Sequence, residues 1–147
     1  MYVFLVIIHI LGASVWTGGH LILTLGFLPR ALRARDPGLI EHFESRFERI
    51  GIPALVVQVV TGLWLAHIRL PAVSRWFTLD TVQSTHIVLK LVLLFLTVVL
   101  AVHARLRLIP RLDAAGLNRL ALHIVAVTVL AVLFVLAGVG FRVGGLF

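Results

Sequence analysis

The chain has 147 residues and a net charge of +7 with histidine counted as neutral, and 61% of its residues are hydrophobic. A mean hydropathy of +1.11 is too high for a soluble globule, so we expect an integral membrane protein with a single domain over residues 1–147. Cysteine is absent, which excludes disulfides and thiolate metal sites. The arginines gather at the ends of apolar runs, a pattern typical of membrane topology and not of nucleic-acid binding.

Four apolar runs joined by modest connections predict four membrane-spanning helices. Their expected bounds are about 2–28, 52–68, 81–108 and 114–141. Pro29 and Arg30 are expected to end the first span together. We therefore predict an all-α fold, an antiparallel four-helix bundle in the membrane.

A charged segment separates the first two spans. Its apolar residues recur at three- and four-residue spacing, which predicts an amphipathic cytoplasmic helix, either at the membrane surface or as an extension of the second span. Asp36 is its expected N-cap, with Pro37 at the first helical position. Asp80 and Asp113 are candidate caps for the third and fourth spans.

The distribution of arginines predicts the orientation of the bundle. The connections after the first and third spans carry nine of them: Arg30, Arg33, Arg35, Arg46, Arg49, Arg105, Arg107, Arg111 and Arg119. The opposite side carries three: Arg69, Arg75 and Arg142. The positive-inside rule then places both odd connections in the cytoplasm and both termini in the periplasm of a bacterial inner membrane.

The first span holds two histidines in a run without charge. His9 and His20 are eleven residues apart, close to three helical turns, so they project within roughly 20° of each other on one face. Trp16 falls on the same stripe. Gly12 and Gly19 lie on a neighbouring stripe, where a bulky group or another backbone could come close. A titratable side chain in hydrocarbon is costly, so these histidines indicate a functional site.

Depth along the spans sorts the basic side chains into two layers. The outer layer holds His9, His67, His86 and Lys90, and the inner layer holds His20, His103 and His123. A histidine near a span end can instead reach water without binding anything. That alternative applies to His67, His86 and His103, and His42 in the charged segment is expected to be solvated.

Lys90 needs an anionic partner, a water-filled cavity or a lowered pKa. All six acidic residues lie in connections or at helix starts. An external anion such as a porphyrin propionate, or an aqueous vestibule, would satisfy the ammonium.

Imidazoles in two layers are consistent with copper or with haem iron. Without cysteine, and with Met1 the only methionine, a copper site would have to be rich in imidazole. Two bis-histidine haems would need matched pairs on two helices, yet the spacing is eleven residues in the first span and seventeen between His86 and His103. That mismatch weakens a two-haem site, while one haem remains compatible.

Three segments resemble the copper resistance protein D (CopD) family in its short four-helix form. They are HILGASVWTGGHLILTLGFLP, RFERIGIPALVVQVVTGLWLA and LKLVLLFLTVVLAVHARLRLIPRL. The resemblance implies copper handling at the bacterial inner membrane. It also implies a role for His9, His20, His123 and the turn from Trp16 to Gly19.

A more distant resemblance is to the HemJ-type protoporphyrinogen oxidases, small four-helix membrane proteins that bind haem b. A first-span histidine seven residues before a tryptophan in that group matches His9 and Trp16, and a third-span lysine is similar to Lys90. The first span here ends several residues later, and His20 is an addition. The resemblance implies a haem site in which His9, Trp16 and Lys90 bind the cofactor.

Our leading hypothesis is a copper-handling membrane protein with metal ligands in both layers. The candidate ligands are His9, His20, His67, His86, His103 and His123. The alternative is a haem b redox protein, either an electron carrier working with quinone or a porphyrinogen oxidase, so the sequence leaves open whether the chain is an enzyme. A third hypothesis is an assembly subunit whose histidines only satisfy each other. The expected partners are the lipid bilayer, a periplasmic copper or electron-transfer protein, and further copies of the chain.

Overall fold

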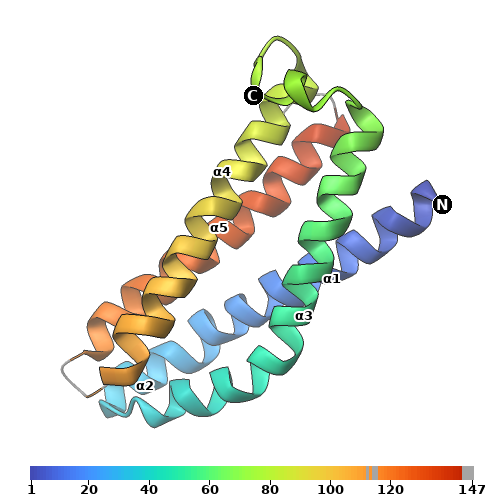
Figure 1. The fold of residues 1–147 in the computed structure, drawn as a ribbon. Helices are drawn as coiled ribbons and strands as arrows, with labels where there is room; N and C mark the ends of the chain where they lie inside the picture. The colour runs from blue at the N-terminus through green and yellow to red at the C-terminus, as the bar shows by residue number, and fades with distance from the viewer. Residues whose placement is uncertain (112, 114–115, 144–147) are drawn as a thin grey trace.

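The computed structural model describes residues 1–111, 113 and 116–143, and Figure 1 shows these folded into helices with no strand among them. Four of the helices are long and apolar enough to cross a membrane. They are α1 (Tyr2–Ile22), α3 (Gly38–Arg69), α4 (Val82–His103) and α5 (Leu117–Val143). Helix α1 lies along α3 and also against α5, while α4 lies along α5. The predicted all-α membrane bundle is confirmed.

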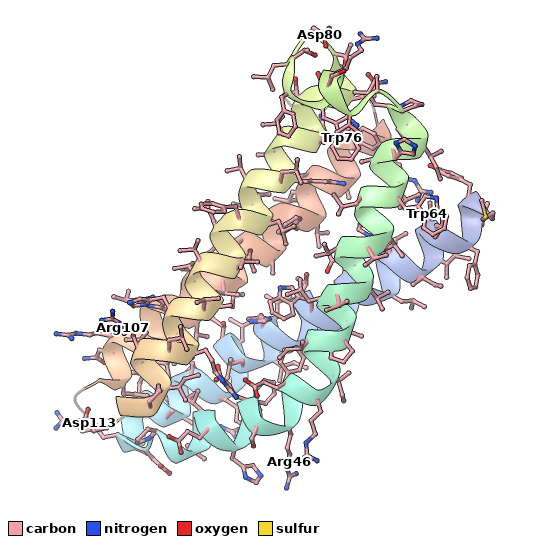
Figure 2. The ribbon with its side chains drawn as sticks, in the orientation of Figure 1. Arg46, Trp64, Trp76, Asp80, Arg107 and Asp113 are labelled. Carbon is pink, nitrogen blue, oxygen red and sulfur yellow. The ribbon has the colours of Figure 1, made fainter. Side chains whose placement is uncertain are left out.

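The two ends of the bundle differ in charge. At the end that we call arginine-rich, the chain turns through α2 (Leu28–Ala34) between α1 and α3, and through η3 (Ala104–Leu108) and η4 (Ile109–Arg111) after α4. At the arginine-poor end, the turn η2 (Val73–Phe77) joins α3 to α4. Figure 2 shows Arg46, Arg107 and Asp113 at the first end and Trp76 and Asp80 at the second.

The first helix does not end at Pro29, which corrects the predicted boundary. A π-helical turn, η1 (Leu23–Phe27), follows α1, and Pro29 then lies in the first turn of α2, which continues to Ala34. Proline has no N–H, and its ring crowds the carbonyl four residues earlier. Because the π turn changes the hydrogen-bond register just before Pro29, the helix continues past it.

The charged segment and the second span form one continuous helix, α3. Of the two predicted arrangements, the extension of the span is therefore the one that forms. Asp36 accepts a hydrogen bond from the Gly38 N–H at 2.9 Å, as predicted for a capping carboxylate, but α3 begins at Gly38 with Pro37 as its N-cap, one residue later than expected. Pro53 lies inside this helix without ending it.

The structure shows what lies at the starts of α4 and α5, where Asp80 and Asp113 are the candidate caps. The N-cap of α4 is Thr81 and not Asp80, because the Thr81 hydroxyl accepts from the Ser84 N–H in a capping box. The Thr81 hydroxyl therefore caps α4, where the sequence predicted the Asp80 carboxylate. Before α5, Asp113 Oδ1 accepts from the Gly116 N–H at 2.6 Å.

Glycines allow α1 and α3 to approach closely. A Cβ added at Gly12 would lie 3.0 Å from the Ala54 carbonyl oxygen of α3, and one added at Gly19 would overlap the Phe47 ring. Gly51 of α3 also borders that ring, since a Cβ there would come within 2.8 Å of it. The predicted stripe of close approach at Gly12 and Gly19 is confirmed.

The largest buried apolar cluster lies toward the arginine-rich end, where α2, α3 and α5 meet. Its members are Leu23, Leu28, Ala31, Ile40, Leu117, Leu120, Ala121 and Ile124. A second cluster of Trp16, Val127 and Ala131 packs α1 against α5 in the middle of the bundle. Large apolar side chains elsewhere on the helices are exposed, as lipid-facing positions require.

We predict that Gly19→Ala destabilises the fold, because the new methyl group must displace the Phe47 ring. Overpacking of this kind costs about 1–3 kcal/mol. Gly18→Ala is the matched control, since a Cβ at Gly18 meets nothing within 4 Å. Unfolding by titration with SDS in mixed micelles measures both variants. Equal stability of the two would show that Phe47 is not held against Gly19.

Candidate functional site

Two histidines of the predicted inner layer meet directly. His103 is the last residue of α4, and its Nδ1 lies 2.9 Å from Nε2 of His123 on α5. The ring centroids are 4.9 Å apart and the ring planes differ by 22°. His103 is exposed and His123 half-buried, so the pair lies at the edge of the bundle, toward the arginine-rich end.

The hydrogen bonds of this pair define the tautomers. His123 Nδ1 is 3.1 Å from the Arg119 carbonyl oxygen, which can only accept, so His123 carries its proton on Nδ1. Its Nε2 therefore accepts, and His103 donates from Nδ1. The neutral pair then presents a free lone pair on Nε2 of His103. Imidazole binds metal through an unprotonated nitrogen of this kind.

His20 lies in a layer of aromatic rings between α1 and α3. Its Nδ1–H donates to the Trp16 carbonyl at 2.9 Å, which leaves Nε2 as the free nitrogen. The ring centroid of His20 is 4.4 Å from that of Trp16 and 5.6 Å from that of Phe47, which it meets edge-on. Phe43 and Phe27 extend the layer toward the arginine-rich end.

His20 does not join His103 and His123 in a three-ligand site. Across residues 1–111, 113 and 116–143, no group of three or more histidine, aspartate or glutamate side chains is placed to hold a metal ion. Hydroxyl groups link α1 to α5 near His20 instead. The Oγ1 atoms of Thr24 and Thr128 are 2.6 Å apart, and Thr128 also donates to the His20 carbonyl at 3.3 Å.

In the predicted outer layer, His9 packs against α3. Its Nδ1 lies 3.0 Å from the hydroxyl oxygen of Thr61, which in turn donates to the Val57 carbonyl at 2.6 Å. Thr61 therefore accepts from the His9 Nδ1–H, and Nε2 of His9 is again the free nitrogen. Gly62 makes room for the ring, since a Cβ there would come 3.0 Å from Cε1 of His9.

Gln58 is a polar residue of this α1–α3 contact that the sequence did not single out as part of a site. Its Oε1 is buried and has no hydrogen-bond partner in the described part of the chain. A buried acceptor without a donor is costly, so this oxygen is available to a bound cation or water. Its signal in the sequence is a lone amide within an otherwise apolar run opposite Gly12.

The other members of the outer layer make no hydrogen bond to His9 in the described part of the chain. Lys90 and His86 of α4 both approach Phe141 of α5: the Lys90 Nζ is 5.5 Å from the ring centroid and the His86 ring is 5.6 Å from it. His86 Nδ1–H donates to a backbone carbonyl one turn earlier at 2.9 Å. His67 is exposed on α3. The predicted outer layer is thus divided between α3 and α5.

A cavity of about 420 Å³ opens at the arginine-rich end between α3, η3 and α5. Glu44, Glu48 and Arg105 contribute to its walls, and Arg105 pairs with Glu48 to connect η3 with α3. Arg105 follows His103 by two residues. The charged cavity therefore lies next to the segment that carries the histidine pair.

The four long apolar helices define a multi-pass membrane protein. Residues 41–141 match the family model described as copper resistance protein D, CopD. Because the match covers more than half of the chain, the protein belongs to the CopD family. The matched region includes His103, His123 and Lys90 and begins after α1, so His9 and His20 lie outside it. No curated protein and no solved structure matched the chain.

We predict that His20 and His123 carry their proton on Nδ1 when neutral, because each donates from this atom to a backbone carbonyl. Nitrogen-15 NMR of protein labelled at histidine distinguishes the two ring nitrogens. His42, which is exposed, serves as the internal reference for a ring without a fixed tautomer. An Nε2–H signal from His20 would show that its Nδ1 does not donate to the Trp16 carbonyl.

Proposed function

We propose that this CopD-family protein handles copper in a bacterial inner membrane, with its histidines acting as successive binding stations for the metal as cargo. The observation that carries the proposal is the His103–His123 pair, in which two helices bring imidazole nitrogens within 2.9 Å. Imidazole is a good copper ligand. Because the chain has no cysteine, nitrogen and oxygen atoms must supply most of any copper site.

Copper would bind this pair by replacing its hydrogen bond. Metal–nitrogen bonds of about 2.0 Å hold two ligand nitrogens roughly 3 to 4 Å apart, depending on the angle at the metal. The exposed His103 ring would rotate to break this hydrogen bond and turn its unprotonated Nε2 toward Nε2 of His123. The Arg119 carbonyl would keep His123 oriented, as an outer hydrogen bond does for most metal-binding histidines.

A station with two imidazoles is better suited to transfer than to storage. A cargo ion must bind tightly enough to enter a site and weakly enough to leave it. We propose His20 as a further inner station and His9 as an outer one, since each has a free Nε2. Near His9, the Gln58 Oε1 offers a partner for a cation.

We propose that the arginine-rich end faces the cytoplasm, as the positive-inside rule requires, and that both termini are periplasmic. The charged cavity at that end would then provide an aqueous approach to the histidine pair. Its walls carry three carboxylates, Glu41, Glu44 and Glu48, of which Glu48 is already paired with Arg105. At the opposite end, a periplasmic copper or electron-transfer protein, or a quinone, would be the exchange partner.

We predict that His103→Ala and His123→Ala each lower the copper affinity of the purified protein by about a hundredfold, because each removes one of two ligands. His42→Ala is the matched control, since it removes an exposed histidine of α3. Equilibrium dialysis followed by elemental analysis measures bound copper, and growth at raised copper measures the consequence in cells. Wild-type binding in both variants would overturn the proposal for this pair.

We predict that His20→Ala removes copper from the inner layer while the fold persists. Because the His20 ring also packs on Trp16 and Phe47, His20→Phe is the informative second variant, as it keeps an aromatic ring and removes the nitrogen. Copper loss in both variants supports ligation by His20. Copper loss in the alanine variant alone would show that the His20 ring has a packing role and is not a copper station.

A haem b redox role is the second candidate, and the hydrogen bonding of His9 favours it. A haem-binding histidine commonly donates its other ring N–H to a fixed acceptor, as His9 does to Thr61. Lys90 would pair with a porphyrin carboxylate. The absorption spectrum of the purified protein separates the candidates: a Soret band that shifts with dithionite supports haem, and a colourless protein with stoichiometric copper supports the first proposal.

A further inference from the structure

Three basic side chains converge on one aromatic ring at the arginine-poor end. The Arg69 guanidinium of α3 lies 5.4 Å from the centroid of Phe141, and the Lys90 Nζ of α4 lies 5.5 Å from it. The His86 ring centroid of α4 is 5.6 Å away. We call these three residues with Phe141 the Phe141 cluster. It joins α3, α4 and α5.

Within the described part of the chain, the Phe141 cluster has no carboxylate partner. The ion pairs recorded there join Arg75 to Asp80 and Arg105 to Glu48. Asp80 is the acidic residue at this end, and it accepts from the Thr78 hydroxyl at 2.6 Å. That hydrogen bond and the Arg75 charge both lower the pKa of Asp80, so its negative charge is already engaged outside the cluster.

An aromatic ring only partly compensates for gathered positive charge. A cation is held only weakly over an aromatic face, whereas one anion can form charge-assisted hydrogen bonds with several cations at once. Arg69 also donates to the Tyr2 hydroxyl and lies over the Tyr2 ring, which holds the guanidinium in place. Its remaining N–H groups are donors in a planar arrangement that matches phosphate oxygens.

The height of the cluster corresponds to the membrane interface. Arg69 is the last residue of α3, and Phe141 lies two residues before the end of α5. Lys90 lies eight residues after the first residue of α4, so its backbone is about 12 Å deeper in the membrane than the start of that helix. A long lysine side chain can extend from this depth toward the headgroups. Exposed apolar side chains of α3 and α4, including Ile68 and Leu89, adjoin this level and would contact acyl chains.

We propose that the Phe141 cluster binds the phosphate group of an anionic phospholipid at the arginine-poor end. Arg69 would contact the phosphate oxygens, Lys90 would reach them from below, and His86 would line the same position. Phe141 would hold the cations together. The site is separate from the His103–His123 pair, and in the described part of the chain none of its four residues is hydrogen-bonded to His9 or His20.

The test measures lipid retained by the full chain in detergent. Native mass spectrometry after addition of phosphatidylglycerol is expected to show a retained lipid, and phosphatidylcholine is expected to bind less. A variant with Arg69→Gln and Lys90→Gln should bind phosphatidylglycerol about 25-fold more weakly, at about fivefold for each cation removed. Arg142→Gln is the matched control, because it removes an exposed arginine from the same end of α5.

A variant without the aromatic ring and a titration with phosphate test the lipid site further. Phe141→Leu retains every charge while removing the ring, so it should weaken lipid retention by less than the double variant does. Titration with inorganic phosphate distinguishes the source of the anion: binding of phosphate at millimolar concentration without lipid retention would assign the anion site to the free ion and overturn the assignment to a lipid. Equal lipid and phosphate binding by the wild type and the double variant, with helicity unchanged, would overturn the site.

Discussion

The close contact of α1 with α3 is the constraint on which the rest of the structure depends. Phe47 packs against Gly19 and Gly51, positions where a Cβ would crowd or overlap the ring. This contact fixes how the two helices are rotated and shifted relative to each other. Because helices are rigid over these lengths, the same alignment places Thr61 opposite His9, which lies more than two turns before Gly19 on α1. It also sets the aromatic surface on which the His20 ring lies.

The histidines with defined neighbours share one arrangement, in which Nδ1 donates to a nearby acceptor. The acceptor is a backbone carbonyl for His20, His86 and His123, a hydroxyl for His9 and a second imidazole for His103. Each ring is thereby oriented by its own helix or its neighbour, and Nε2 is the unprotonated nitrogen, which in His123 accepts from His103. Such pre-orientation lowers the cost of binding a metal, because the ring does not have to be ordered at that moment.

Charge is handled differently at the two ends of the bundle. At the arginine-rich end, Arg105 pairs with Glu48 beside a charged cavity. At the arginine-poor end, basic side chains gather around Phe141, and the nearby Asp80 is engaged by Arg75 and Thr78. At the first end positive charge is thus paired with carboxylates, and at the second it is gathered around an aromatic ring. This asymmetry accompanies a bundle whose middle carries hydroxyls and imidazoles within apolar surroundings.

The sequence by itself determined the four spans, the all-α class, the unequal distribution of arginine and the close-approach stripe at Gly12 and Gly19, because these follow from hydropathy and helical periodicity. It placed the end of the first helix wrongly at Pro29. The helix continues because a π turn shifts the hydrogen-bond register before the proline, and no residue pattern in the sequence predicts such a turn. Depth grouped His20 with His103 and His123, yet only the tertiary structure decided which of them meet. Depth fixes the height of a side chain, whereas contact also requires the rotation of each helix about its axis, and packing between helices sets that rotation.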